Sequence, residues 1–125
     1  MKWSAEMIDK IIRKFRFAYH GIIHGIKYDS SIRIQFTCAL LAILVSLIFR
    51  FTAEEFAIVL LFCGLILGLE YTNSSIERIM NLEEPEISKA VKHIKDMAAG
   101  GVLIASVFAL IVGIMFILRR SEERV

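Results

Sequence analysis

The stretch from Phe56 to Asn81 reads FAIVLLFCGLILGLEYTNSSIERIMN, an uncharged apolar run followed by a polar segment. In the polar segment, carboxylate and amide side chains recur every three or four residues, at Glu70, Asn73, Glu77 and Asn81. At about 100° per residue, these spacings return to nearly the same side of an α-helix. One helical stripe therefore carries two carboxylates and two amides. A carboxylate directly after such an apolar run is rare without a function.

The length of the apolar run decides how far this helix must extend. Residues 56–69 cover only about 21 Å at 1.5 Å per residue, which is less than the hydrocarbon core of about 30 Å. The helix must therefore continue through Glu70 and Asn73 before it leaves a bilayer. We predict a membrane span over about 56–76, with Glu70 inside the bilayer near its exit and Glu77 at the headgroup boundary.

The remaining composition indicates an all-α integral membrane protein. With 57% hydrophobic residues, this chain of 125 residues is too apolar for an ordinary soluble domain. Two further apolar runs predict spans over about 32–49 and 97–118. A net charge of +2, with no aromatic-interleaved basic stripe, argues against a nucleic-acid partner. No repeat or linker divides the chain, so we expect a single domain over residues 1–125.

The N-terminal segment has a different pattern. From Ile8 to Ile26 the apolar residues recur at spacings of three and four, while basic residues and histidines occupy the other faces. This pattern predicts an amphipathic surface helix over about 8–26, whose basic side suits anionic lipid headgroups. The same helix could instead pack on the protein's own membrane helices, and the two arrangements are compatible.

Orientation follows from the lysines and arginines. Of the 15 in the chain, seven precede the first predicted span or lie at its start, and four lie between Arg78 and Lys95. These eleven fall on one side of a three-span arrangement, which we therefore expect to be cytoplasmic. Asp29, Glu77 and Lys95 should then lie at the cytoplasmic face of the cell membrane, with Asp96 beside them.

The residue types in this region point to chemistry with phosphate. Carboxylate oxygens suit Mg²⁺, which takes one or two carboxylates together with water and substrate phosphates, and a nearby lysine suits a phosphate. Glu70, held deeper than the others, could accept a proton from a lipid hydroxyl. No Walker A or GxGxxG loop occurs. An alternative is that Glu70 and Asn73 only join helices by hydrogen bonds, while Glu77, Lys95 and Asp96 are solvated charges.

Two motifs resemble those of a known family. EYTNSSIE, from Glu70 to Glu77, is similar to the Glu-x-x-Asn-(Thr/Ser)-Ala-Ile-Glu signature of the bacterial diacylglycerol kinase and undecaprenol kinase family. KDMAAGGV, from Lys95 to Val102, resembles the stretch that opens the last helix of that family. The resemblance extends over nearly the whole chain. It implies an integral-membrane lipid kinase, generally a homotrimeric helical bundle, that uses MgATP to phosphorylate a lipid alcohol.

The resemblance also implies roles for single residues. Glu70 would be the catalytic base and Asn73 a catalytic positioning residue. Glu77 and Asp29 would bind the Mg²⁺ ion that bridges the ATP phosphates. The remaining nucleotide contacts would come from Lys95, Asp96, Lys10, Phe17, Glu86 and Ser88. The chain departs from the family pattern at Asp29, where relatives carry glutamate, at Asn81, where they carry aspartate, and at Gln35.

These features lead to an expected function with alternatives. We expect phosphorylation of undecaprenol to undecaprenyl phosphate, because the AlaAlaGly form of the second motif resembles that of Gram-positive members. Phosphorylation of diacylglycerol to phosphatidic acid is the first alternative. A non-catalytic helical membrane protein, a degenerate relative, is the second, and the departures at Asp29 and Asn81 favour it. An ion or proton channel is a poorer fit, because one intramembrane carboxylate near one face makes a weak relay.

Overall fold

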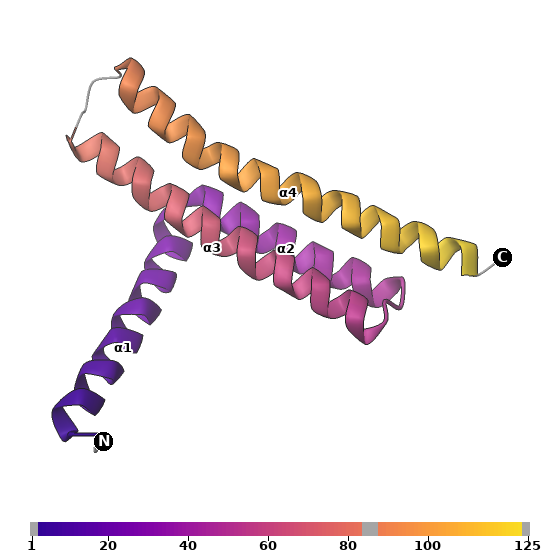
Figure 1. Ribbon diagram of the computed structural model, residues 1–125, viewed down its shortest axis with the longest axis horizontal. Coiled ribbons are helices and arrows are strands. Elements are labelled where there is room, and N and C mark those ends of the chain that lie inside the picture. Colours follow the sequence, from indigo (N-terminus) through magenta and orange to yellow (C-terminus); the bar gives the residue numbers. More distant parts are fainter. Residues whose placement is uncertain (1–2, 84–87, 124–125) are drawn as a thin grey trace.

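The computed structural model describes residues 3–83 and 88–123. In these ranges the chain is all-α, with four helices in the order α1 (Ala5–Tyr28), α2 (Ser30–Ile48), α3 (Ala53–Glu83) and α4 (Lys89–Glu123), shown in Figure 1. The predicted all-α class and the four helices are confirmed. Proline favours the first turn of a helix, and Pro85, which precedes the last helix, lies outside the described residues. The described part of that helix begins at Lys89.

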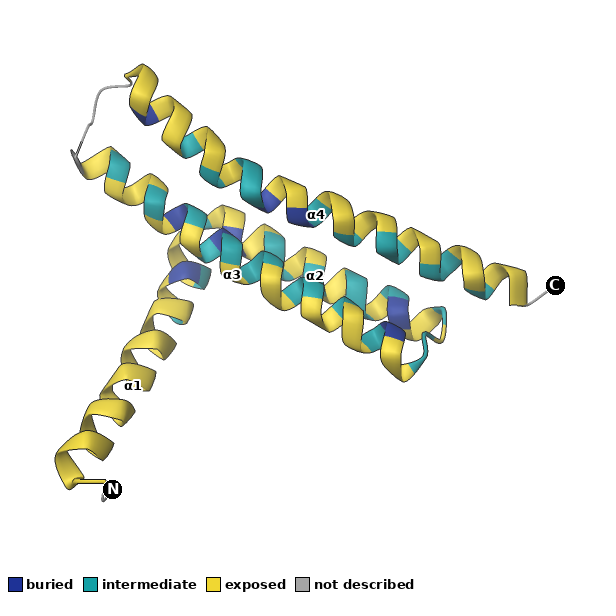
Figure 2. Cartoon of the chain, in the orientation of Figure 1, coloured by how far each residue is buried: buried dark blue, intermediate teal, exposed yellow. Residues whose placement is uncertain are grey.

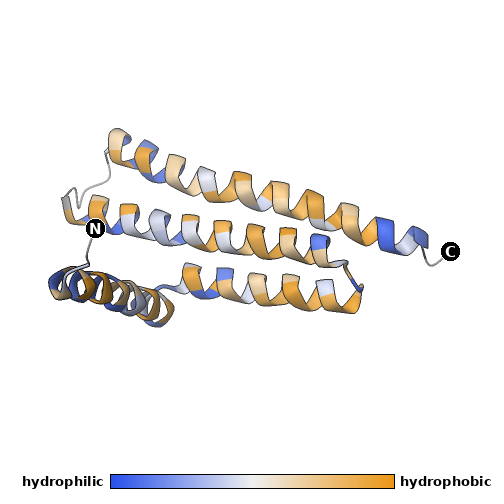
Figure 3. Ribbon diagram, turned by 60° about the horizontal axis from the view of Figure 1, so that its bottom comes forward, coloured by the Kyte–Doolittle hydropathy of each residue, from blue (hydrophilic) through white to orange (hydrophobic). Residues whose placement is uncertain are grey.

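Helix α3 is the centre of the bundle. Both α2 and α4 pack along it, and Figure 3 shows the three helices side by side with α3 between the other two. Helix α1 instead runs away from the bundle at a wide angle and meets it through its C-terminal end (Figure 1). Helix α3 is longer than the predicted span, since it continues to Glu83. The polar stripe thus lies on an unbroken helix.

A single residue makes the corner between α1 and α2. Asp29 has an extended backbone, which ends α1, and its Oδ1 accepts a hydrogen bond of 3.2 Å from the Ile32 amide as the N-cap of α2. Arg33 reinforces the corner, because its Nη1 donates to the carbonyls of Ile26 at 2.9 Å and Lys27 at 3.0 Å. The corner therefore places the Asp29 carboxylate where α1, α2 and α3 meet.

The bundle buries little of its apolar surface within one chain. Buried hydrophobic residues are few, at Ile32, Val91, Val102 and Ala105. Figure 2 shows mostly exposed outer faces, and Figure 3 shows that these faces on α2 and α4 are strongly hydrophobic. Helices α2 and α4 are each long and apolar enough to cross a membrane. Such exposed apolar surface would be unfavourable in water, so it suits contact with lipid or with other membrane helices.

Candidate active site on helix α3

Burial decreases along the polar stripe of α3. Glu70 is 5% exposed, Asn73 is half-buried, and Glu77 and Asn81 are exposed. Asn73 lies three residues from Glu70 on the same face of α3, so the two side chains are neighbours on the helix surface. The structure thus places the two predicted catalytic residues side by side on one helix face. One end of the stripe is shielded by the bundle, while the other end is open to solvent.

The second carboxylate of the site belongs to Asp29, whose side chain is 14% exposed. Burial alone would raise the pKa of Asp29, but hydrogen bonds from the Ser74 hydroxyl and from the amides of Ile32 and Ser31 outweigh it. The Arg78 guanidinium, with Nη2 at 3.8 Å from Asp29 Oδ2, acts in the same direction. The pKa therefore lies below its usual value, and Asp29 is ionised at neutral pH.

A second stripe of α3 holds the end of α1, and sequence reasoning missed it. The Tyr71 hydroxyl donates a hydrogen bond of 2.6 Å to the Ile22 carbonyl, and Arg78 Nη1 lies 3.1 Å from His24 Nε2. A small cavity of about 80 Å³ lies between these elements. Its lining from α3 is Tyr71, Ser74, Ser75 and Arg78. Their spacing of three, four and seven residues from Tyr71 was the available signal, since it marks one helical face.

The oxygen donors around Glu70 fit Mg²⁺ in their chemistry. Glu70 lies within electrostatic range of both Asp29 and Glu77, so three carboxylates share one region of the molecule. The described residues contain no group of three or more His, Cys, Asp or Glu side chains already placed around a metal position. Mg²⁺ does not require one, because it commonly takes one or two carboxylates and completes its shell with water and phosphate oxygens.

Lys95 and Asp96 lie on α4, across from the outer end of the stripe. Lys95 Nζ donates a hydrogen bond of 3.0 Å to Asn81 Oδ1, which joins the two helices. Asp96 pairs with Lys92 on its own helix at 2.7 Å, and both side chains are well exposed. The structure therefore connects Lys95 to the polar stripe through Asn81. Asp96 has its partner on α4 and not on the stripe.

The other predicted nucleotide contacts are not gathered at the stripe. Lys10 and Phe17 are exposed on α1, most of which runs away from the bundle (Figure 1). The Ser88 hydroxyl accepts a hydrogen bond of 3.2 Å from the Val91 amide, so it acts as the N-cap of α4. Glu86 lies outside the described residues. In this single chain, Lys10 and Phe17 are therefore separated from Glu70.

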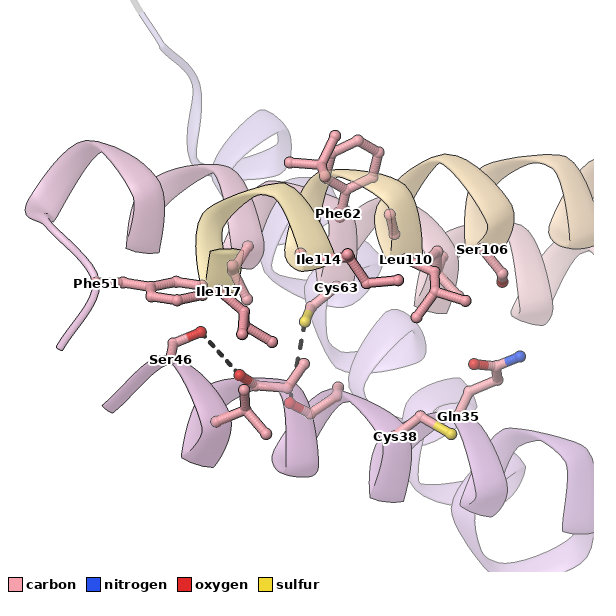
Figure 4. Close-up of a pocket in the computed structure, with 18 residues that line it drawn as sticks. Gln35, Cys38, Ser46, Phe51, Phe62, Cys63, Ser106, Leu110, Ile114 and Ile117 are labelled. Carbon is pink, nitrogen blue, oxygen red and sulfur yellow. Dashed lines mark hydrogen bonds between the residues drawn. The ribbon is translucent and has the colours of Figure 1, made fainter. Parts of the chain in front are cut away.

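An apolar cavity of about 590 Å³ lies between α2, α3 and α4 (Figure 4). Gln35, Cys38 and Ser106 lie toward one end, and Phe51, Ser46 and Ile117 toward the other (Figure 4). Ile66 also lines it, and this residue precedes Glu70 by four positions, or about one helical turn. The buried end of the stripe thus borders an apolar space.

Comparison with known proteins identifies the family of this chain. The family described as prokaryotic diacylglycerol kinase matches residues 16–117, which include the Asp29 corner, both stripes of α3 and the start of α4. The chain is 27% identical over 109 residues to a diacylglycerol kinase of Synechocystis sp., covering 86% of this chain and 62% of that protein. It is 23% identical over 111 residues to an undecaprenol kinase of Bacillus subtilis, covering 89% and 90%.

The family match includes every candidate site residue except Lys10, and the two relatives carry the names of lipid kinases. The resemblance predicted from the two motifs is therefore confirmed. This chain belongs to the prokaryotic diacylglycerol kinase family, a family of membrane lipid kinases.

Proposed function

We propose that this protein transfers the γ-phosphate of ATP to the hydroxyl group of a membrane lipid alcohol. The observation that carries the proposal is the burial gradient along α3, where Glu70 is 5% exposed and Glu77 is exposed. A lipid hydroxyl arrives from the membrane, whereas ATP arrives from water. A stripe that is shielded at Glu70 and open at Glu77 can serve both reactants.

The reaction is an in-line displacement at the γ-phosphorus. Glu70 accepts the hydroxyl proton as the lipid oxygen bonds to phosphorus, and the bond to the β-phosphate oxygen breaks to release ADP. Asn73, one helical turn from Glu70 on the same face of α3, orients the carboxylate or the incoming hydroxyl. Lys95 supplies a positive charge for the phosphate oxygens. Asp29 and Glu77 would hold Mg²⁺, which when bound neutralises charge on those oxygens.

We extend the proposal to the whole chain in its membrane. Residues 56–76 of α3 form a membrane span in addition to those of α2 and α4. The end of the bundle that carries Glu77 and Lys95 faces the cytoplasm. A homotrimer follows from the family resemblance. It also offers a route for Lys10 and Phe17 to a nucleotide site, because α1 runs away from the bundle of its own chain (Figure 1).

Undecaprenol is the lipid that we place first. The second motif has the AlaAlaGly form, and the match to the undecaprenol kinase of Bacillus subtilis covers 90% of that protein. The match to the diacylglycerol kinase of Synechocystis sp. covers 62% of that protein at a slightly higher identity. The form of the second motif is the feature that supports undecaprenol over diacylglycerol.

The test is direct transfer of labelled phosphate. Purified protein in lipid nanodiscs is incubated with Mg²⁺ and γ-labelled ATP, with undecaprenol in one set and diacylglycerol in another, and the lipids are separated by thin-layer chromatography. We expect label in undecaprenyl phosphate. Label only in phosphatidic acid would support the kinase activity and overturn the assignment of undecaprenol as the substrate. No label in either lipid would support the non-catalytic alternative.

A further inference from the structure

Arg78 bridges α3 to the corner between α1 and α2 through three groups. Its Nη1 lies 3.1 Å from His24 Nε2, its Nη2 donates to the Tyr28 carbonyl at 3.4 Å, and Nη2 is 3.8 Å from Asp29 Oδ2. These contacts span about 50 residues of sequence and come from one side chain. Arg78 follows Glu77 directly, yet it has no role in the reaction described above.

The Asp29 carboxylate has two different environments at its two oxygens. Oδ1 accepts a hydrogen bond from the Ile32 amide as the helix cap, whereas Oδ2 faces the Arg78 guanidinium. An oxygen paired with a guanidinium gives up part of that interaction when it binds a divalent cation, because the two positive charges repel each other. Oδ1 is already committed to the corner. A cation that binds to Asp29 therefore has to displace the Arg78 guanidinium from Oδ2.

We propose that Arg78 is a positioning residue that competes with the divalent cation for Asp29. Without nucleotide, Arg78 neutralises Asp29 and holds the corner in place. When a cation binds to Asp29, Arg78 keeps its contacts with His24 and the Tyr28 carbonyl, so the corner stays attached to α3. The inference rests on the proposed function only in taking Asp29 as a metal ligand.

The expected size of the effect follows from exposure. The Arg78 side chain is 46% exposed, so solvent screens its interaction with Asp29 and the ion pair is a modest one. Removal of the guanidinium should tighten cation binding at Asp29 by about fivefold. The gain in cation affinity should require the Asp29 carboxylate, because it arises from the loss of the Arg78–Asp29 ion pair.

The experiment measures binding of Mn²⁺ alone, in detergent and without nucleotide, from the electron paramagnetic resonance signal of the free ion. Wild type is compared with Arg78→Gln and with Arg78→Lys, which keeps the charge on a narrower head group. We expect about fivefold tighter binding for Arg78→Gln and a smaller gain for Arg78→Lys. Circular dichroism and size-exclusion profiles confirm the fold of each variant, and Arg78→Lys keeps the test possible if Arg78→Gln misfolds.

Arg33 provides a matched control. It lies at the same corner and donates to the carbonyls of Ile26 and Lys27, but these contacts do not involve the Asp29 carboxylate. Arg33→Gln removes the same charge, and we expect it to leave Mn²⁺ affinity unchanged. In an Asp29→Asn background, Arg78→Gln should have no effect.

Equal affinity in wild type and Arg78→Gln would overturn the inference, as would an equal gain in Arg33→Gln or in the Asp29→Asn background. A lack of Mn²⁺ binding in every variant would also overturn it. Phosphate transfer to lipid by wild type is measured separately. The transfer measurement tests the kinase proposal, and the Mn²⁺ titrations test the competition between Arg78 and the cation, so the two can fail independently.

Discussion

At the scale of single residues, Glu55 shows how the end of the bundle away from the polar stripe is held. Its carboxylate is 3% exposed, accepts a hydrogen bond of 2.8 Å from the Thr52 amide, and pairs with Arg120 at 3.0 Å and Arg119 at 3.5 Å. The Glu55 amide in turn donates to the Thr52 hydroxyl, which completes a capping box at the start of α3. One side chain thus caps α3 and joins it to the end of α4.

Replacement of this carboxylate should destabilise the fold without affecting catalysis. Burial alone would raise the pKa of Glu55, but the Thr52 amide and the two arginines outweigh it, so the pKa lies below its usual value of 4.5. We expect Glu55→Gln to lower the free energy of unfolding by about 3 kcal/mol at neutral pH, because two arginines lose a buried partner. Unfolding in detergent, followed by circular dichroism, measures this difference.

The pH dependence of this effect has a defined sign. A depressed folded-state pKa means that the contribution of Glu55 is fully present above pH 4.5 and is lost as the pH falls through the lower folded value. The stability difference between wild type and Glu55→Gln should therefore narrow below pH 4.5. The neighbouring Glu54 is exposed, so Glu54→Gln serves as the control and should change stability little at any pH. A difference that stays constant with pH would contradict the assigned ion pair.

At the scale of elements, the junction of α1 with α3 depends on close approach. Gly25 is the buried residue of α1, and a Cβ atom there would clash with the Tyr71 ring. The Tyr71 hydroxyl also donates to the Ile22 carbonyl of α1. The small residue and the ring together set how the surface helix leaves the bundle.

Two glycine substitutions on α1 should therefore have opposite effects. Gly25→Ala should lower stability by about 1–3 kcal/mol, because the methyl group forces α1 away from Tyr71. At Gly21 an added Cβ meets nothing within 4 Å, so Gly21→Ala should raise stability by about 0.5–1 kcal/mol through helix propensity alone. Thermal unfolding in detergent measures both. Destabilisation of equal size at both positions would contradict the close contact.

The elements themselves could largely be predicted from the sequence, whereas the contacts between them could not. Helical spacing predicts that Glu70 and Asn73 share one stripe, and the short apolar run predicts that the helix continues beyond its last apolar residue. Local patterns do not reveal partners far along the chain, such as Tyr71 with Ile22 or Arg78 with His24. Those contacts depend on the angle at the Asp29 corner, which a sequence pattern does not contain.

The same limit applies to the candidate site. The sequence pattern placed Lys95 near the stripe, and the structure connects it there through Asn81. The pattern did not show that Asp96 pairs with Lys92, or that Lys10 and Phe17 lie on a helix that leaves the bundle. Side-chain partners are decided by tertiary packing, which a local sequence pattern does not contain.

At the scale of the whole molecule, the number of membrane crossings decides where the site lies. Helices α2 and α4 are each long and apolar enough to span a membrane. We propose that residues 56–76 of α3 form a further span. Three spans place the two ends of the chain on opposite sides of the membrane, whereas two spans place them on the same side. The proposed cytoplasmic site requires the first arrangement.

Labelling of single cysteines tests this topology in intact cells. Cys38 and Cys63 are first replaced by alanine, and a cysteine is then introduced by Glu6→Cys or Glu122→Cys, both at exposed positions. A membrane-impermeant maleimide should label the Glu122→Cys variant from outside and the Glu6→Cys variant only after permeabilisation. Labelling of both from outside, or of neither, would contradict three spans.

We propose that the buried carboxylate of Glu70 accepts the proton of the lipid hydroxyl, and a variant without this carboxylate tests that role. Glu70→Gln keeps the size of the side chain but replaces the basic carboxylate with a neutral amide, while Glu54→Gln makes the same change at an exposed site near the other end of α3. Transfer of labelled phosphate to lipid is measured for both in nanodiscs. We expect Glu70→Gln to lose at least about 100-fold in turnover and Glu54→Gln to retain it. Near-normal turnover in a folded Glu70→Gln variant would rule out this role for Glu70.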